Sequence, residues 1–144
     1  GRVTYLSDLK AREERQVPFL DLRWPYQTDR NVTGGMLRSG GRLYLKGLGV
    51  HSAAWLSYPL SQPYRRFQAE LSIDDGTCGG GSVRFRVFVD GSPKYASPTV
   101  RGGMAPLPVS VDLSGAKQLD LVVDFADRAD ELDHANWLDA RLVR

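Results

Sequence analysis

The chain has 144 residues, a length that suits one compact domain with its own hydrophobic core. Its 19 basic and 17 acidic residues are interleaved and leave a net charge of +2, so no run of one sign marks a nucleic-acid-binding arm. No window approaches the roughly 18 consecutive apolar residues that a membrane-spanning helix needs. Composition therefore argues against a membrane span and gives no reason to expect DNA or RNA as a partner.

The start of the chain and its cysteine content carry little functional information. The chain begins Gly-Arg-Val-Thr-Tyr, without a Met or an apolar leader segment, so we expect an excised domain whose targeting sequence lies elsewhere. The single cysteine, Cys78, cannot form an internal disulfide or build a cysteine-based zinc site. It precedes Gly79-Gly80-Gly81, which we interpret as a hairpin tip.

Short segments with period-two hydrophobicity recur along the chain. Residues 8–16, rich in Lys, Arg and Glu, are the one segment that could form a helical turn. Residues 82–90 alternate polar side chains with four apolar ones, typical of a half-buried strand: Val83, Phe85, Val87 and Val89. Asp90-Gly91 then predicts a tight turn into residues 94–96. Similar patterns predict strands at residues 64–73, 109–113, 119–123 and 137–143.

These short strands, bounded by Gly, Pro, Asp or Ser, predict one fold class. We expect a single all-β domain over residues 1–144, an antiparallel β-sandwich or jelly roll. A sandwich supplies a rigid frame, and its loops usually carry the functional side chains.

Catalysis is the first function to weigh, because the chain is rich in aspartate. Glycoside hydrolysis needs two carboxylates flanking one bond, and six aspartates could supply such a pair: Asp74, Asp75, Asp127, Asp130, Asp133 and Asp139. Aspartates in turns more often bond their own backbone. The sequence also lacks the serine-hydrolase, zinc-protease and phosphate-loop motifs. We therefore predict that the domain is not an enzyme.

Sugar binding requires fewer specific residues than catalysis, since it needs an aromatic face and a few fixed polar groups. Trp24 and Trp55 lie in turn-like segments, and Trp55 has small and polar neighbours, so we expect one of these two rings to stack on a sugar. Trp137 opens a strand and is predicted to pack in the core. Next to it, His134 and Asn136 offer hydrogen-bonding groups.

Seven motifs carry a resemblance to a known family. In chain order they are Tyr5–Leu9, Gly40–Ser52, Tyr64–Phe67, Ile73–Asp75, Val87–Gly91, Val111–Ala116 with Leu119, and Asp133–Ala140. Over nearly its whole length, the chain resembles the NPCBM family of carbohydrate-binding modules. The resemblance implies a galactose-binding-like β-sandwich, appended to secreted glycosidases or other extracellular proteins, that binds galactose-containing glycans.

The chain departs from the family pattern at three positions. Asn136 stands where the family usually has Asp, Leu138 where it has Ala, and Trp55 where a small polar or charged residue is common. We expect the changes at 136 and 55 to affect ligand preference. The residues predicted to bind sugar are His51, Trp55, Asp75, His134, Asn136 and Trp24. For His51, Asp75, Asp133 and His134, the alternative is that they hold loops together.

Galactose-binding-like sandwiches often carry a structural calcium ion, which takes six to eight oxygen ligands. The segment from Asp29 to Gly34 resembles the calcium loop of discoidin-like relatives, whose last ligands come from residues entering the final strand, here Leu138 and Asp139. The predicted calcium ligands are therefore Asp29, Asn31 and Asp139. A rival site consists of Asp127, Asp130 and Asp133. Turn capping and surface salt bridges are the alternatives to both.

Together these features predict a non-catalytic carbohydrate-binding module that tethers a larger secreted protein to a glycan surface. The alternative is a protein-interaction or architectural module that kept the fold without binding sugar. A shallow loop surface poor in aromatic rings would favour the alternative, and an exposed Trp beside convergent polar groups would favour sugar.

Overall fold

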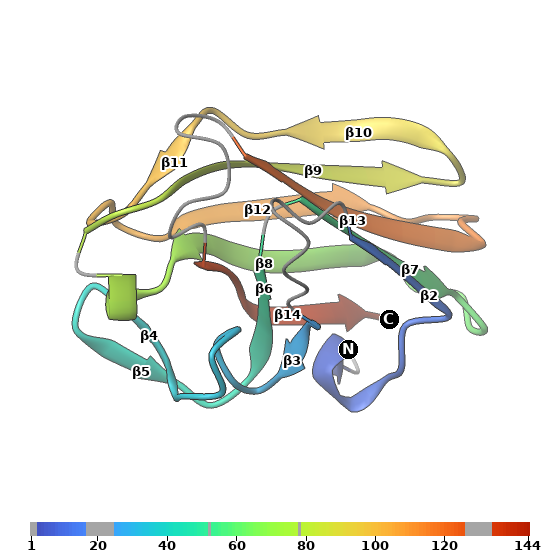
Figure 1. Ribbon diagram of the computed structural model, residues 1–144. Coiled ribbons are helices and arrows are strands. Elements are labelled where there is room, and N and C mark those ends of the chain that lie inside the picture. The colour runs from blue at the N-terminus through green and yellow to red at the C-terminus, as the bar shows by residue number, and fades with distance from the viewer. Residues whose placement is uncertain (1–2, 17–24, 52, 78, 126–133) are drawn as a thin grey trace.

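The computed structural model describes residues 3–16, 25–51, 53–77, 79–125 and 134–144. In these residues two antiparallel sheets pack face to face as a β-sandwich (Figure 1). In spatial order, sheet A contains β12 (Leu107–Asp112), β8 (Arg66–Ile73), β14 (His134–Val143), β6 (Gly47–His51) and β3 (Gln27–Thr28), with β1 (Val3–Tyr5) beside β14. Sheet B contains β10 (Ser92–Ala96), β9 (Ser82–Val89), β13 (Gln118–Phe125), β7 (Ala54–Pro59) and β2 (Glu13–Gln16), with β11 (Val100–Arg101) beside β9. The predicted all-β sandwich is confirmed.

Strand β9 illustrates how alternating apolar side chains build the core. Val83, Phe85 and Val87 are fully buried, and Val89 is 7% exposed, whereas Arg84 is exposed between them. The predicted turn after β9 is also present: Asp90 and Gly91 have φ of 50° and 82°, and β9 pairs with β10 directly across them. Two positive φ values suit the tight turns that join antiparallel strands.

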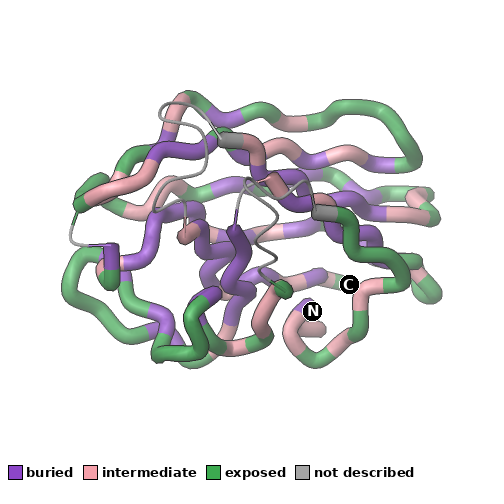
Figure 2. The backbone as a smooth tube through the Cα atoms, viewed as in Figure 1, coloured by how far each residue is buried: buried purple, intermediate pink, exposed green. Residues whose placement is uncertain are grey.

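Among the described residues, Trp137 of β14 is the largest fully buried side chain. Its ring meets Phe85 of sheet B edge to face, with centroids 5.0 Å apart, and lies 6.0 Å from the ring of Phe67. Edge-to-face contacts add stabilisation beyond the burial of apolar area. Figure 2 shows the buried residues concentrated between the two sheets. The prediction that Trp137 packs in the core is therefore confirmed.

Three interpretations of the sequence need correction. Residues 8–16 do not form a helical turn, because η1 (Leu6–Asp8) ends at Asp8 and Glu13–Gln16 is β2. Pairing of β2 with the sheet edge at β7 outweighs the helix propensity of its charged residues. Gly79-Gly80-Gly81 is no hairpin tip, since β8 and β9 on either side belong to different sheets. Trp55 lies within β7 and not in a loop.

Residues 29–46, here called the flap, lie against the outer face of sheet A. The flap contains the hairpin β4 (Leu37–Ser39) and β5 (Arg42–Tyr44). Leu37 and Tyr44 pack with Leu138 of β14 in a small second core. Gly49 of β6 lets the flap approach closely, because a Cβ at this position would lie 2.6 Å from the Cα of Asn31. The flap therefore packs against β6 at a position where that strand has no side chain.

We predict that Gly49→Ala lowers the free energy of unfolding by about 3 kcal/mol, since the flap must move away from β6 to admit the methyl group. Urea unfolding measures the change. The control is Gly103→Ala, where a Cβ meets nothing within 4 Å and only a φ of +84° opposes the substitution. That variant should lose about 1 kcal/mol. Equal losses in the two variants would contradict the close approach.

Candidate functional site

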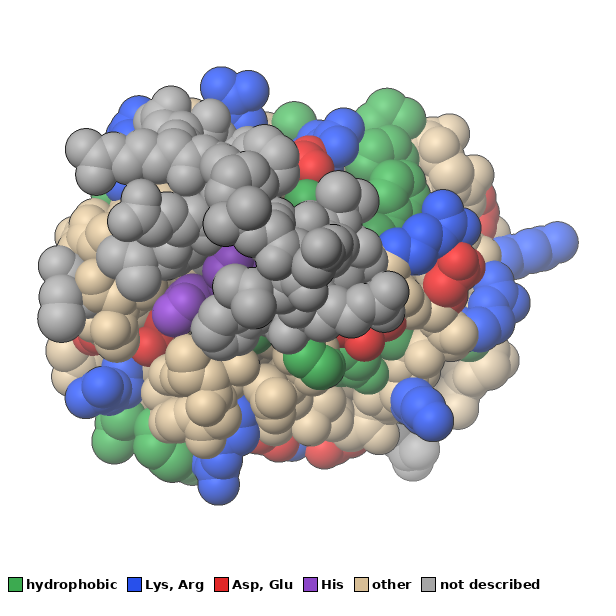
Figure 3. Space-filling model, viewed as in Figure 1, with side chains coloured by type: hydrophobic (Ala, Val, Ile, Leu, Met, Phe, Trp, Pro, Cys, Tyr) green, Lys and Arg blue, Asp and Glu red, His purple; other side chains and the backbone are tan. Residues whose placement is uncertain are grey.

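His51 and His134 meet at the outer face of sheet A. They are register partners on the adjacent strands β6 and β14, and their ring centroids lie 5.5 Å apart with the planes tilted by 54°. The neighbours Val50 and Ala135 point into the core, so the two imidazoles point outward. Figure 3 shows the two histidines side by side on the molecular surface. The sheet register thus joins two motifs that are 83 positions apart in the sequence.

The environment of His134 favours the neutral form of its imidazole. Burial lowers the pKa of His134, and the nearby His51 lowers it further, while the charge of Asp74 acts in the opposite direction. A neutral imidazole has one nitrogen that donates and one that accepts a hydrogen bond. His51 is only 4% exposed, and His134 is half-buried. Of the two rings, His134 is therefore the more accessible.

Beside the histidines lies a buried carboxylate, Asp74, which is 2% exposed. Its Oδ1 accepts hydrogen bonds from the backbone N–H of Arg38 and from Nδ2 of Asn136, both at 3.0 Å. Its Oδ2 accepts from Nδ2 of Asn31 at 3.0 Å and from the N–H of Gly76 at 2.8 Å. Its own backbone N–H donates to the carbonyl of His134 at 2.8 Å. Asp74 therefore links the flap, β14 and the turn after β8.

Two residues predicted to bind sugar form hydrogen bonds with other parts of the protein. Asn136 is fully buried, and its amide donates to Asp74. The carboxylate of Asp75 accepts hydrogen bonds from the backbone N–H groups of Gly40 at 3.0 Å and Gly41 at 2.8 Å, at the tip of the flap hairpin. The contacts of Asp75 are those expected under its alternative role of holding loops together.

Trp55, one of the two tryptophans predicted to stack on sugar, lies on the other sheet. Trp55 alternates with Ala54 and Leu56 of the core, so it points away from the core on sheet B, whereas the histidines point outward from sheet A. Its ring stacks on Phe88 at 5.3 Å between centroids, and Arg15 lies 6.0 Å from it. Trp24 lies outside the described residues.

Two of the three predicted calcium ligands, Asp29 and Asn31, have other side-chain partners. Oδ2 of Asp29 pairs with Nζ of Lys46 at 2.9 Å, and its Oδ1 accepts from the N–H of Gly47. Oδ1 of Asn31 accepts three hydrogen bonds, two from Thr33 and one from Gly35. Burial raises the pKa of Asp139, which favours its neutral form. A calcium ion at Asp29 and Asn31 would have to displace these hydrogen bonds, because it is coordinated by the same carboxylate and amide oxygens.

Among the described residues there is no cluster of three or more His, Cys, Asp and Glu that could hold a metal ion. The rival calcium site at Asp127, Asp130 and Asp133 lies outside those residues. Sequence reasoning named Asp74 as a carboxylate of a motif but missed its central role. The available signal was its place directly after a strand of alternating buried residues.

Comparison with known protein families assigns the chain to one of them. The model of the NPCBM/NEW2 domain matches residues 2–143. The chain belongs to the NPCBM/NEW2 family.

Two curated relatives of this NPCBM domain are much longer enzymes. One is a putative endo-alpha-N-acetylgalactosaminidase of Renibacterium salmoninarum, 34% identical over 76% of the chain. The other is alpha-1,3-galactosidase B of Akkermansia muciniphila, 33% identical over 77% of the chain. The chain spans only 7% and 14% of these two proteins.

Solved relatives of the NPCBM domain are carbohydrate-binding modules. CBM51-2 of Clostridium perfringens ZmpB, solved with INT domains and in complex with GlcNAc, has a TM-score of 0.86 at 30% identity, over 98% of this chain and 31% of that one. CBM51 from Clostridium perfringens GH95, in complex with methyl-galactose, has a TM-score of 0.86 at 25% identity, over 99% and 100% of the two chains. The domain is thus a non-catalytic carbohydrate-binding module, separate from the enzymes' catalytic parts. None of its described helices could span a membrane.

The hydrogen bonds of Asp74 predict that Asp74→Asn lowers the free energy of unfolding by about 2–4 kcal/mol. The substitution removes a buried charge that four N–H groups face and turns an NH₂ group toward some of those donors. Asp75→Asn is the matched control, because its partners lie on an exposed turn, and it should cost about 0.5–1 kcal/mol. Chemical unfolding of both variants checks the ranking, and a smaller loss for Asp74→Asn would refute it.

The lowered pKa of His134 predicts a pH dependence of stability. Below its ordinary pKa of about 6.5, the unfolded chain binds a proton that the folded chain binds less readily. The contribution of His134 is therefore present above that pH and is lost as the pH falls toward the folded pKa. Unfolding free energies at pH 7.5 and pH 5 should show the native domain losing more stability than His134→Asn. An equal or smaller loss in the native domain would contradict the assignment.

Proposed function

We propose that this domain binds galactose-containing glycans and is an accessory module of a larger secreted protein. The observation that carries the proposal is the outward-facing pair His51 and His134, set beside the rigid Asp74 network. The complex of CBM51 from Clostridium perfringens GH95 with methyl-galactose supports the choice of sugar. The two enzyme relatives, named for galactosidase and N-acetylgalactosaminidase activities, support it as well.

The two imidazoles would hydrogen-bond sugar hydroxyl groups. Each hydroxyl can donate and accept, and so can the neutral ring of His134. Asp74, Asn136 and Asn31 would act indirectly, because their mutual hydrogen bonds hold β14 and the flap in place around the histidines. Since these groups are already ordered, binding costs little conformational entropy in the protein. A single sugar residue still buries little area, so its affinity is expected to be weak.

The solved relatives suggest two candidate sugars. The ZmpB relative was solved with GlcNAc, and the GH95 relative with methyl-galactose. We favour galactose because both curated enzyme relatives are named for galactose or N-acetylgalactosamine chemistry.

The second candidate function is a protein-interaction module without sugar binding. The observation that favours it is apolar exposure on the flap, where Leu43 is 58%, Leu45 is 77% and Met36 is 39% exposed. Exposed apolar side chains that cluster on one hairpin are a common feature of protein-binding surfaces. This function makes no use of His51 and His134, so it can be tested separately.

A glycan-array screen of the purified domain tests the proposed function. We expect selective binding to glycans with terminal galactose, and His134→Ala should weaken binding about tenfold or more through loss of one polar contact. Trp55→Ala is the matched variant on the opposite sheet and should bind as the native domain does. Chelator should leave binding unchanged, because Asp29 and Asn31 have other side-chain partners.

The outcomes separate the alternatives, provided that thermal unfolding shows both variants to be folded. Loss of binding in Trp55→Ala alone would move the site to the outer face of sheet B. Sensitivity to chelator would mean that a calcium ion supports the site. No binding to any glycan would favour the protein-interaction function.

A further inference from the structure

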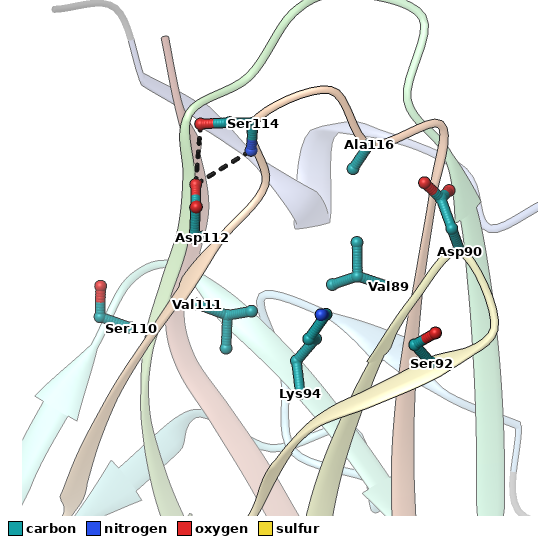
Figure 4. Close-up of a pocket in the computed structure, with 9 residues that line it drawn as sticks. All are labelled: Val89, Asp90, Ser92, Lys94, Ser110, Val111, Asp112, Ser114 and Ala116. Carbon is teal, nitrogen blue, oxygen red and sulfur yellow. Dashed lines mark hydrogen bonds between the residues drawn. The ribbon is translucent and has the colours of Figure 1, made fainter.

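We propose that a cavity at the opposite end of the sandwich is a second binding site for a neutral sugar residue. The inference rests on the proposed function for its ligand class. The cavity has a volume of about 500 Å³, is open to solvent on one side, and is bordered by the turn after β9, by β10, and by β12 with the turn that follows it (Figure 4). Its lining is Val89, Asp90, Ser92, Lys94, Ser110, Val111, Asp112, Ser114 and Ala116.

The walls of the cavity are polar, and its floor is apolar. Val89 and Val111 are buried at 7% and 5% exposure, and their side chains face the space between the walls in Figure 4. Lys94 extends between the two aspartates, from the strand that pairs with β9. Pockets for small ligands usually combine apolar surface with a few convergent polar groups.

Local hydrogen bonds fix both carboxylates. Oδ1 of Asp90 accepts from the backbone N–H groups of Lys117 at 2.9 Å and Gln118 at 2.8 Å. Oδ1 of Asp112 accepts from the N–H of Ser114 at 3.0 Å and from its hydroxyl at 2.8 Å. These bonds use one oxygen of each carboxylate and leave the other as an acceptor for a ligand. The acceptors are therefore ordered before any ligand arrives, which lowers the entropic cost of binding.

The mixture of charges selects the class of ligand. The two aspartates and Lys94 leave the lining with an excess of one negative charge, which disfavours an anion. Lys94 extends between the two carboxylates, where a cation would otherwise be attracted. A neutral polyhydroxyl ligand suits both kinds of charge, because each sugar hydroxyl donates to a carboxylate oxygen and accepts from the ammonium or a serine. The valine floor would cover the apolar side of the sugar ring. The chemistry therefore indicates a neutral hexose.

The cavity is distant from the histidine pair. Asp112 is the register partner of Arg66 at the start of β8, whereas Ala135, next to His134, is the partner of Ile73 at its end. Seven residue steps at about 3.3 Å place the two sites about 23 Å apart along the strand. Separate sugar residues must therefore occupy them.

Titration of the ¹⁵N-labelled domain with methyl galactoside, followed by NMR, tests the proposal. We expect saturable shifts of the amides of Ser92, Lys94 and Ser114, with a dissociation constant different from that of the amides around His134. Lys94→Met should weaken the shifts at the cavity about tenfold by removing a charged hydrogen-bond donor, and should leave those at His134 unchanged. Lys10→Met, which removes an exposed charge from outside the cavity lining, should change neither set.

Three other outcomes would overturn the proposal. Shifts at His134 without shifts at the cavity would leave the proposed function standing and remove the second site. Cavity shifts that vanish in His134→Ala would show that they only report binding at the first site. Absence of shifts in both regions would contradict the second site and the proposed galactose binding together.

Discussion

The arrangement around the candidate site depends on one buried charge, the carboxylate of Asp74. Burial of a carboxylate is costly unless hydrogen bonds compensate it, and four N–H groups from three parts of the chain do so here. One donor belongs to β14, two to the flap and one to the turn after β8. Without Asp74 the flap would lose these hydrogen bonds and would keep its other ones to sheet A, from Tyr44 to Glu70 and at Asp29 and Lys46. The packing of Leu37 and Tyr44 against Leu138 would then carry more of the attachment.

Successive side chains of a strand point to opposite faces of its sheet, and this alternation decides which side chains can lie at one site. His51 ends β6 in sheet A, and Ala54 begins β7 in sheet B, so the chain changes sheets within a few residues. Outward positions before and after this crossing therefore face opposite sides of the sandwich. Closeness in sequence made Trp55 look like a neighbour of His51, but the register joins His51 to His134 instead.

Much of the fold was predictable, because strands with one buried face alternate visibly, as β9 and most of β8 do. Strand β6 escaped prediction since Gly47 and Gly49 occupy its outward positions and contribute no side chain to the pattern. In β7 the outward Trp55 is as apolar as the inward Leu56, which hides the alternation. For the site, the sequence indicated the paired histidines but not the difference between Asp74 and Asp75. The position of the flap buries Asp74 and leaves Asp75 at a turn. That position depends on tertiary packing.

The sandwich leaves its strand ends available for binding, whereas the flap already covers part of one face. At one end the strands present His51 and His134, and at the other two turns surround Lys94 between fixed carboxylates. Each arrangement offers few contacts, so each would bind a single sugar weakly. Weak sites on one rigid domain gain apparent affinity when the glycan surface is dense enough to engage both at once. This gain in apparent affinity requires no change in either site. It depends on the distance between the two sites, which the length of β8 sets.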